Sequence, residues 1–502
     1  MRGFASRVGR LFFFSLLPAM AKKVLIAFNG TRGDVQPYVL AGKILEQGGF
    51  EVMLAGPGDA KALAEHCEVK FQRTRLSFQR IMHQPGVAEA MEKDDMMTVA
   101  TIKEKRVAEH KEEELKAMYE LLTSFKPDLV LCGPLCIPDT LALCKMRRIP
   151  VIVFCLHRWR PSRYVTPVGV SDSMPGGMKM ACWKLLLRLS VRASRQLDIP
   201  ILDRILGFSS KPYYPTYREY CDYIMNAPAF LSLVAESNAL MGDLPADFSS
   251  NIVQIGALMM PPKEQEGTEF GAAQSSELDR FLEAGPSPVY CGFGSIICKS
   301  SKFMTLLCLR GLMMSGQRGV VASSWSNMSM ELLEGEPDSA ELIAYAKEKV
   351  LFMKTAPHGT LFPRCSVIVH HGGSGTSNAS VRSGTPTIIC PIWFDQFDNS
   401  AAVNARGIGV GMQNMRKVKP ADLAAAITKC LGSASIKARA REVAEAISKE
   451  DSAGKLVSII KEYMQDFVAT GRHLKLQDEL LRHSKSSWFS CCSKPHRPEA
   501  DY

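Results

Sequence analysis

Beyond its first residues the chain lacks any apolar run near the ~18–20 residues that a membrane-spanning helix needs. It also lacks the spacing of cysteines and histidines that holds a structural metal, although it contains 15 cysteines. Hydrophobic residues make up 46% and charged residues 22% of the 502, the balance of an ordinary soluble protein. These proportions exclude a disordered, collagen-like or coiled-coil chain, and the length predicts two or three domains.

The body of the chain has little excess of positive over negative charge, although the net charge of the whole chain is +10. Residues 1–23 hold five basic and no acidic residues, a net charge of +5. Residues 472–502 hold six basic and four acidic residues, a net charge of +2, so the two ends carry +7 of the net +10. The nearly neutral body offers no basic groove. We therefore expect no nucleic-acid partner.

The cysteines and the glycosylation sequons favour a cytoplasmic location. The cysteines are odd in number and irregularly spaced, which is typical of reduced, buried thiols. Three Asn-x-Ser/Thr sequons begin at Asn29, Asn327 and Asn378. The first and third lie in loops to which we assign the chemistry below, where a glycan would obstruct the site.

Both ends carry features typical of membrane contact. Residues 1–21 place basic residues, an apolar segment and small residues in the order of a secretory signal; an interfacial anchor and an extension ahead of a second start at Met20 are the alternatives. In the tail, residues 471–502, Cys491 and Cys492 adjoin aromatic and basic residues, as in S-palmitoylated segments; the alternative is a disordered tail. We therefore expect a cytoplasmic protein, with peripheral membrane association as a further hypothesis.

Between these ends, buried strands alternate with helices in two sets. The first set, residues 22–245, opens with a βαβ unit in which strands at 24–28 and 51–55 flank a helix at 35–47. A charged helix at 103–125 and strands at 127–132 and 149–154 continue it. This alternation predicts a parallel sheet with ligands at the carboxyl ends of its strands.

The second set, residues 246–470, repeats the alternation, and polar residues 261–276 place the boundary between about 240 and 280. Its strands are expected at 288–291, 319–322, 350–352, 367–371 and 386–390. The fold class is therefore α/β, with two doubly wound Rossmann-like domains and a ligand in the cleft between them.

A glycine-rich turn in the second set leaves a strand and enters a helix. The segment His370-His371-Gly372-Gly373-Ser374-Gly375-Thr376 lets backbone N–H groups approach an anion at the positive end of that helix. No lysine follows the last glycine, so the turn is not a Walker A loop. The structural alternative is a close crossing of strand and helix.

Two further turns are expected at the same edge of this sheet. Asp395-Gln396, one strand later, pairs an acceptor carboxylate with an amide that both donates and accepts, which suits several sugar hydroxyls. Gly292-Phe293-Gly294-Ser295 is a tight strand-end turn with exposed N–H groups. Together the three turns predict a phosphate cradle beside a hydroxyl clamp.

The stretch 370–406 closely resembles the donor-nucleotide signature of sterol 3-β-glucosyltransferases, which vancomycin-type and UDP-glucosyltransferases share. The opening "GTRGDVQP" at 30–37 is similar to that family's Gly-Ser-Arg-Gly-Asp-Val-Gln-Pro, and the segments 292–295, 356–358 and 361–365 match in order. The resemblance implies the GT-B fold, two Rossmann-like domains facing across a cleft. It also implies UDP-glucose or a related UDP-sugar as co-substrate, a sterol or other lipid-like alcohol as acceptor, and neither metal nor cofactor.

The resemblance also implies roles for individual residues of the donor site. His371 would bind the donor's β-phosphate, Asp395 and Gln396 would hold the sugar, and His358 would border the nucleobase. The expected donor-binding residues are Gly30, Arg32, Gly33, Ser295, His358, His371, Gly372, Gly373, Ser374, Gly375, Thr376, Asp395 and Gln396.

Asp34 would be the catalytic base of a single in-line displacement that inverts the anomeric centre. An acceptor hydroxyl has a pKa far above 7, and a positioned carboxylate contributes ~10²–10⁴-fold to its attack. The alternative for Asp34 is a capping carboxylate at the start of the helix at 35–47, and the two roles can coexist.

The chain departs from the family at Gly359-Thr360, where many members have Asp-Trp next to the expected base contacts. Three functions stay open: a UDP-sugar-dependent hexosyltransferase acting on a sterol-like lipid, the same enzyme acting on a polyketide or other small metabolite, and a non-catalytic, membrane-peripheral protein that binds a sugar nucleotide or a lipid. Asp34, His371 and the Asp395-Gln396 pair favour an enzyme.

Overall fold

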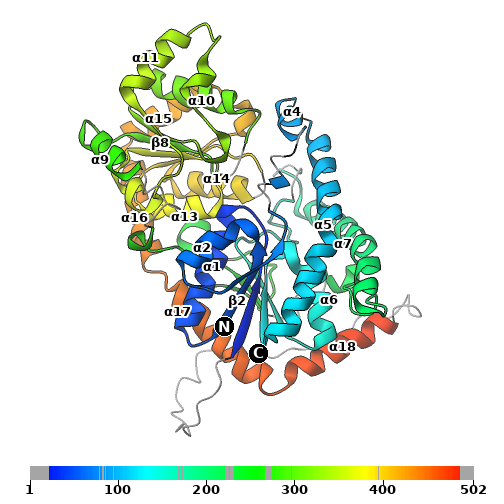
Figure 1. The fold of residues 1–502 in the computed structure, drawn as a ribbon. Helices are drawn as coiled ribbons and strands as arrows, with labels where there is room; N and C mark the ends of the chain where they lie inside the picture. The colour runs from blue at the N-terminus through cyan, green and yellow to red at the C-terminus, as the bar shows by residue number, and fades with distance from the viewer. Residues whose placement is uncertain are drawn as a thin grey trace.

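Two parallel β-sheets, each covered by helices, form the framework of the protein (Figure 1). The computed structural model describes residues 22–77, 80–81, 84, 86–93, 95–167, 170, 173–220, 225, 231–265, 274–294, 297–393 and 395–486. Ser295 and the two end segments for which membrane contact is a hypothesis, residues 1–21 and 487–502 with Cys491 and Cys492, lie outside this description.

The first sheet has seven strands in the order β3-β2-β1-β4-β5-β6-β7, all parallel. The strands are β1 Lys23–Ala27, β2 Glu51–Pro57, β3 Phe71–Arg75, β4 Leu129–Cys132, β5 Val151–Cys155, β6 Ser232–Val234 and β7 Ile252–Gln254. The helices of this region are α1 Arg32–Gln47, α2 Lys61–His66, α4 Val87–Glu92, α5 Met96–Phe125, α6 Ile137–Arg147, α7 Gly176–Leu206 and α8 Asn238–Met241. The change of direction in strand order beside β1 marks the switch point where ligands bind in such sheets.

The second sheet has six parallel strands in the order β10-β9-β8-β11-β12-β13. Its strands are β8 Val289–Gly292, β9 Gly319–Ala322, β10 Val350–Met353, β11 Val367–His370, β12 Thr387–Ile389 and β13 Gly409–Gly411. The helices that follow the linker are α9 Ser275–Glu283, α10 Ser301–Met314, α11 Ser339–Lys349, α12 His358–Leu361, α13 Ser374–Arg382, α14 Asp395–Arg406, α15 Pro420–Gly432, α16 Ala434–Ser448, α17 Ser452–Tyr463 and α18 Arg472–Ser486.

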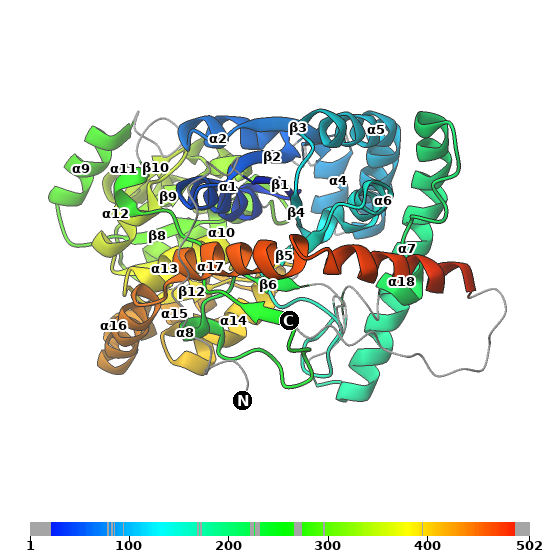
Figure 2. The same cartoon turned by 90° about the horizontal axis from the view of Figure 1, so that it is seen from below.

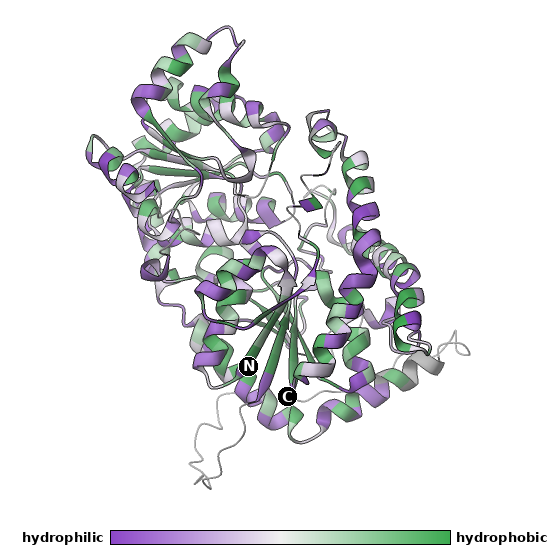
Figure 3. Cartoon of the chain, in the orientation of Figure 1, coloured by the Kyte–Doolittle hydropathy of each residue, from purple (hydrophilic) through white to green (hydrophobic). Residues whose placement is uncertain are grey.

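The central strands of each sheet are buried on both faces, as their continuous apolar sequences require. In β1, Val24 and Ile26 pack into the core under α1, whereas Leu25 and Ala27 point into the core under α5 and α6. Successive side chains of a strand point to opposite faces, so one short apolar run supplies two cores. Figure 3 shows the resulting apolar strands between helices whose outer faces are hydrophilic.

The C-terminal helices return to the first domain instead of ending on the second. Leu456 and Ile460 of α17 are fully buried in the core beneath α1, and Gln477 of α18 donates a hydrogen bond to the carbonyl of Ile149 (3.0 Å). Arg148 of the first domain pairs with Asp478 of α18 at 2.7 Å. Figures 1 and 2 show α17 and α18 running together along the base of the first domain.

These contacts correct the expected domain limits. The boundary at residue 245 falls too early, because β7 still pairs with β6 of the first sheet. The unit 246–470 ends too late, because the apolar stripe of α17 belongs to the first core. The segment expected as a tail from residue 471 forms α18 as far as Ser486.

The cysteines of the described residues are all free thiols, and every one of them except Cys182 is buried. Burial raises the pKa of several of the buried thiols, for example that of Cys136 to about 11, which keeps those thiols protonated and unreactive at neutral pH. Within the described ranges, no helix has the length and apolar character to cross a bilayer.

Candidate active site

The N-termini of two helices meet where the two domains touch. Helix α1 follows β1 in the first sheet, and α13 follows β11 in the second. Their backbones approach closely at two glycines, since a Cβ on Gly375 would lie 3.4 Å from the carbonyl oxygen of Gly33. Both helices thereby present the positive ends of their dipoles to the domain junction.

Asp34 lies in the first turn of α1, facing this junction. Its Oδ2 accepts hydrogen bonds from the backbone N–H (2.8 Å) and the hydroxyl (3.2 Å) of Thr31, the residue that caps the helix. Among the described residues, no hydrogen bond reaches its other oxygen, Oδ1. The expected capping role is therefore present, and it occupies only one of the two carboxylate oxygens.

The surroundings of Asp34 raise the pKa of its carboxyl. Burial is the largest cause, and the negative charge of Asp395 across the junction adds to it. The Thr31 hydrogen bonds and the charge of His157 oppose the rise. A carboxylate with a raised pKa is a stronger base, provided that it stays ionised at the working pH.

Gly30 allows the loop to fold over this carboxylate. Its φ of +144° is a conformation that side chains with a Cβ rarely adopt, and a Cβ at this position would lie 2.5 Å from Oδ2 of Asp34. The glycine of the opening motif is therefore required by the backbone around Asp34.

Asp395 and Ser374 join the starts of two helices of the second domain. Asp395 begins α14, and its Oδ2 accepts a hydrogen bond from the hydroxyl of Ser374, the first residue of α13 (3.1 Å). The structure therefore brings together the glycine-rich turn and the Asp395-Gln396 pair, as the sequence predicts.

Gln396, which the sequence predicts to hold sugar hydroxyls, uses its amide oxygen to hold the backbone of its own loop. It is buried, and its Oε1 accepts hydrogen bonds from the backbone N–H groups of Ile392 (2.8 Å) and Trp393 (3.1 Å). The amide oxygen therefore holds the loop that precedes α14. Only the amide nitrogen remains to donate to a sugar hydroxyl.

His371 is buried directly before the glycine turn. A Cβ on Gly294 would lie 3.1 Å from its Cε1, and a Cβ on Gly373 would lie 2.5 Å from its Nε2, so glycines on both sides make room for the ring. Its Nδ1 is buried and has no hydrogen-bond partner in the described structure. Burial lowers the pKa of His371 to about 4, which keeps the ring neutral with one N–H to offer.

His370, its neighbour, stabilises the turn. The backbone N–H of Gly372 donates to Nδ1 of His370 (3.0 Å), which places the ring proton on Nε2, and Nε2 in turn lies 3.0 Å from the hydroxyl of Thr387. Gly372 has a φ of +96°, and a Cβ there would lie 2.6 Å from Ile389. The two histidines therefore differ: His370 is fully engaged, whereas His371 keeps a free nitrogen.

The first turn of α13 is built to receive an anion. Gly373 caps the helix without a side-chain hydrogen bond, and neither Ser374, Gly375 nor Thr376 is acidic. The first N–H groups of a helix have no partner within it, so these amides remain available beside His371.

His358 lies in a small aromatic cluster at the start of α12. Its ring stacks on Phe362 at 4.4 Å between centroids, and its Nε2 lies 3.1 Å from the hydroxyl of Tyr290. Burial lowers the pKa of His358 to about 4, helped by the charges of Arg32 and His371. Arg32 of the first domain therefore lies near this cluster, as the donor-site prediction requires.

Gly359, where the sequence departs from the family it resembles, is contacted by the interdomain linker, the segment between β7 and α9. The N–H of Gly359 donates to Oε1 of Gln265 (2.8 Å), and a Cβ on Gly359 would lie 3.0 Å from Gln265 and from Pro262. Glu264 of the same linker pairs with Lys43 of α1 at 2.7 Å. The position at which the resemblance led us to expect an acidic residue is here covered by the linker.

His157, which no motif of the sequence marks, acts electrostatically on Asp34. His157 follows β5 and has a buried Nδ1 without a partner in the described residues. Arg158 and Arg160 of the same loop have structural roles: Arg158 pairs with Glu236 at 2.7 Å, and Arg160 is fully buried. A histidine at the carboxyl end of a central strand was the only available signal.

The described residues contain no group of histidine, cysteine, aspartate and glutamate side chains that could hold a metal ion. That this site works without a metal stays a prediction. The groups at the junction that can face an anion include the positive ends of the helix dipoles, Arg32, and the neutral N–H donors of His371 and α13.

Comparisons with known proteins find similar sequences among sterol 3-beta-glucosyltransferases. The family model of the erythromycin biosynthesis protein CIII-like C-terminal domain matches residues 332–463. Sterol 3-beta-glucosyltransferase UGT80B1 of Arabidopsis thaliana is 23% identical over 94% of this chain and 74% of its own length. Sterol 3-beta-glucosyltransferase UGT80A2 of the same plant is 26% identical over 87% of this chain and 64% of its own length. The sterol 3-beta-glucosyltransferase of Vanderwaltozyma polyspora is 31% identical over 42% of this chain and 17% of its own length. The chain thus spans about two thirds of the length of UGT80A2 and a small part of the fungal relative.

Solved structures share the architecture at low sequence identity. The glycotransferase of kitacinnamycin superposes with a TM-score of 0.58 at 16% identity, covering 88% of this chain and 99% of that one. The calicheamicin glycosyltransferase CalG4 gives 0.58 at 14% identity, covering 89% and 99%. At this identity the likeness concerns the fold alone.

Proposed function

We propose that this chain, which has the GT-B fold of the glycosyltransferases it resembles, moves a hexose from a UDP-sugar to a hydroxyl of a sterol or similar lipid-like alcohol. The resemblance to sterol 3-beta-glucosyltransferases over 87–94% of the chain supports the reaction class. The observation that carries the proposal is the meeting of Asp34, with one free carboxylate oxygen, and the uncapped start of α13 beside His371.

In this proposal the diphosphate of the donor lies on the first turn of α13. The N–H groups of Ser374, Gly375 and Thr376 and the neutral ring of His371 donate to phosphate oxygens. Asp395 accepts hydrogen bonds from sugar hydroxyls, and the Ser374 hydroxyl holds it in place. His358 and its aromatic neighbours border the base.

The chemical step is a single displacement. Oδ1 of Asp34 takes the proton of the acceptor hydroxyl as that oxygen attacks the anomeric carbon, and the bond from this carbon to the diphosphate oxygen breaks. The negative charge that develops on UDP lies against the helix dipole and the N–H donors of α13. Attack opposite to the leaving group converts an α-linked donor sugar into a β-glycoside.

The acceptor and the location belong to the same proposal. A lipid-like alcohol would reach Asp34 from the first domain, and such an acceptor favours a cytoplasmic protein held peripherally at a membrane. A polyketide or other small metabolite is the second candidate acceptor, because the family model that matches residues 332–463 carries the name of an erythromycin biosynthesis protein.

A donor and acceptor screen tests the proposal. Purified chain is incubated with UDP-glucose, UDP-galactose and UDP-N-acetylglucosamine, each with a panel of sterols and a panel of macrolides, and both UDP release and glycoside formation are measured. A sterol glycoside from one donor is the expected result. A glycosylated macrolide without a sterol glycoside would show that the acceptor is a polyketide and not a sterol. Donor binding without turnover on either panel would overturn the enzymatic proposal.

A further inference from the structure

Helix α7 exposes a stripe of large apolar side chains on its outer face. Met178, Leu185 and Leu189 are 55%, 58% and 55% exposed. Their spacing of seven and four residues places them within about 20° of one line along a helix. Leu186, beside them, is 38% exposed. Isolated apolar residues on a surface need no explanation, but a continuous stripe does.

The stripe does not belong to the core, because the opposite side of α7 already packs there. Trp183 is 1% exposed and donates its indole N–H to the carbonyl of Val165 (2.9 Å). Val191 and Leu202 are also buried. Figures 1 and 2 show α7 at the outer edge of the first domain, where α5 and α6 lie on its inner side.

Basic residues line the apolar stripe. Lys184, Arg188 and Arg192 are exposed and follow one another at intervals of four, which forms a row next to the leucines. The helix has no acidic residue before Asp198. Within the described residues, none of these three cations has an ion-pair partner.

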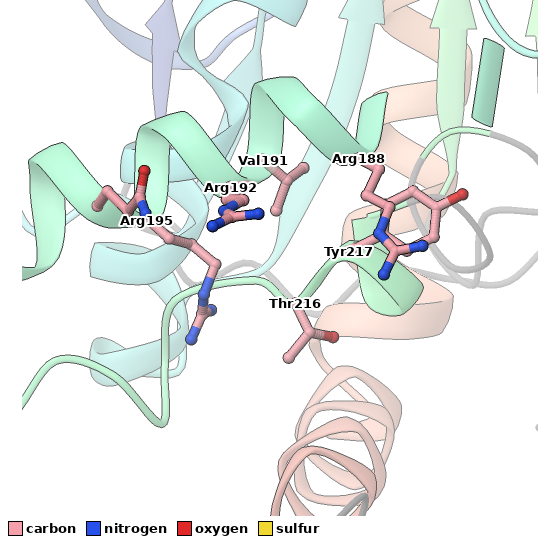
Figure 4. Close-up of a pocket in the computed structure, with 7 residues that line it drawn as sticks. Arg188, Val191, Arg192, Arg195, Thr216 and Tyr217 are labelled. Carbon is pink, nitrogen blue, oxygen red and sulfur yellow. The ribbon is translucent and has the colours of Figure 1, made fainter. Parts of the chain in front are cut away.

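A groove of about 400 Å³ continues the basic row toward the loop at 213–217 (Figure 4). Arg188 lies over the ring of Tyr217 (5.9 Å), and Arg195 donates to the carbonyl of Tyr214 (2.6 Å). The side chains of Arg188 and Arg195 are therefore held against the fold, and Arg192 also lines the groove.

We propose that the outer face of α7 is the surface by which this protein docks on an anionic lipid bilayer. Apolar side chains enter the boundary between headgroups and acyl chains, and the neighbouring cations face the lipid phosphates, which is the pattern of an interfacial helix. The absence of acidic residues along this face favours a uniformly negative partner over the mixed surface of a protein.

The position of α7 connects this surface with the reaction site, and this step depends on the proposed function. Trp183 contacts Trp159 at 4.7 Å between ring centroids, and Trp159 contacts His157 at 6.5 Å. His157 in turn acts electrostatically on Asp34. Trp183 lies on the inner side of α7, so docking through the outer face would connect the bilayer-facing helix, through these buried ring contacts, with the loop that carries His157.

Vesicle cosedimentation of the full chain tests the docking surface. The vesicles contain phosphatidylcholine alone or with about 30% phosphatidylserine, and no sugar nucleotide is present. The variant L185S/L189S is expected to bind at least about tenfold more weakly. The affinity of the variant R188E/R192E for vesicles with phosphatidylserine is expected to fall at least about 25-fold, because each basic residue near the surface contributes about fivefold to that affinity.

Matched surface variants in other elements control for general effects. Met314→Ser removes an exposed apolar side chain from α10, and K449E/K455E reverses two exposed charges near α17. Both should bind vesicles as the unmodified chain does. Circular dichroism and thermal unfolding confirm that all variants remain folded.

The outcomes separate docking from catalysis. Normal vesicle binding by both α7 variants would overturn the docking surface, whatever the enzyme does in the donor and acceptor screen. A change in oligomeric state of the α7 variants without a change in vesicle binding would assign the stripe to a second copy of the chain and would also overturn it. Loss of binding with full turnover of a detergent-solubilised acceptor would establish it.

Discussion

Replacing Asp34 with Asn changes the proposed base and little else. Thr31 holds only Oδ2 of Asp34, through contacts of 2.8 and 3.2 Å. The amide oxygen of Asn can accept the same two hydrogen bonds, whereas the amide nitrogen cannot accept a proton. We expect kcat to fall by ~10²–10⁴-fold, a barrier increase of about 3–5 kcal/mol, while UDP-sugar affinity and thermal stability stay close to those of the unmodified chain.

Asp422→Asn is the matched control for this change. Asp422 occupies the same position in the first turn of α15, and its carboxylate accepts a hydrogen bond from the backbone N–H of Lys419 (3.0 Å). Both variants lose one carboxylate at a helix start, but only Asp34 faces the domain junction. Steady-state kinetics with UDP-sugar and acceptor, together with calorimetric titration of UDP, measure both effects.

The pH profile adds a second readout of the same residue. Burial and the charge of Asp395 raise the pKa of Asp34, so kcat/KM should fall on the acidic side at a pH above the ordinary carboxyl value of about 4. An Asp34→Asn enzyme that transfers sugar within about threefold of the unmodified rate, with the same acidic limb, would refute the base assignment.

Three further predictions concern the glycines, the buried histidine and the C-terminal helices. Gly30→Ala should abolish most turnover, because the new Cβ would displace the carboxylate of Asp34. Gly49 has a φ of +94° with open space around it, so Gly49→Ala should lower the free energy of unfolding by only about 1–3 kcal/mol. Enzyme kinetics and urea unfolding compare the two variants. The pKa of His371 falls from its usual 6.5 to about 4 in the folded state, so protonation favours unfolding, and the unfolding free energy should drop by about 1–2 kcal/mol from pH 6.5 to 5. His371→Gln should remove this part of the pH dependence and weaken UDP binding about tenfold, and an unchanged pH slope would contradict the assignment. Ile460→Ala should destabilise the first domain by about 2–5 kcal/mol, seen as early exchange of β1 amides, and no change in those amides would separate α17 from that core.

Local patterns were sufficient to predict the strands that position the site. β8 and β11 are fully buried runs and β1 is buried after its first residue, Lys23; such apolar runs bounded by turn residues can be recognised without tertiary information. β6, β7 and β13 have three residues each, too few for a period to be recognised, and their pairing with neighbouring strands defines them. The early domain boundary at residue 245 follows from that short β7.

The return of the C-terminal helices could not be predicted from periodicity. An amphipathic stripe such as Leu456 and Ile460 shows that a helix packs on a core, but it does not show which of two cores. Arg148 with Asp478 and Gln477 with Ile149 then hold α18 to the first domain. These pairs lie far apart in the sequence and only the fold brings them together.

At the candidate site the sequence predicted proximity better than individual roles. The glycine-rich turn, Asp395 and Asp34 converge as expected, because all follow strands at facing sheet edges. Gln396 was expected as a hydroxyl clamp, but its oxygen holds its own loop. His157 gave almost no signal as one histidine in a basic loop, and its place beside Asp34 depends on the packing of β5 against β4.

The anomeric configuration of the product tests the central claim most directly. The purified chain is given an α-linked UDP-hexose and the acceptor found in the screen, and the coupling of the anomeric proton is read from the NMR spectrum of the fresh product. The account predicts a β-glycoside, formed by the unmodified chain and by Asp422→Asn but not at a comparable rate by Asp34→Asn. An α-glycoside as the first product would contradict the single displacement with Asp34 as its base.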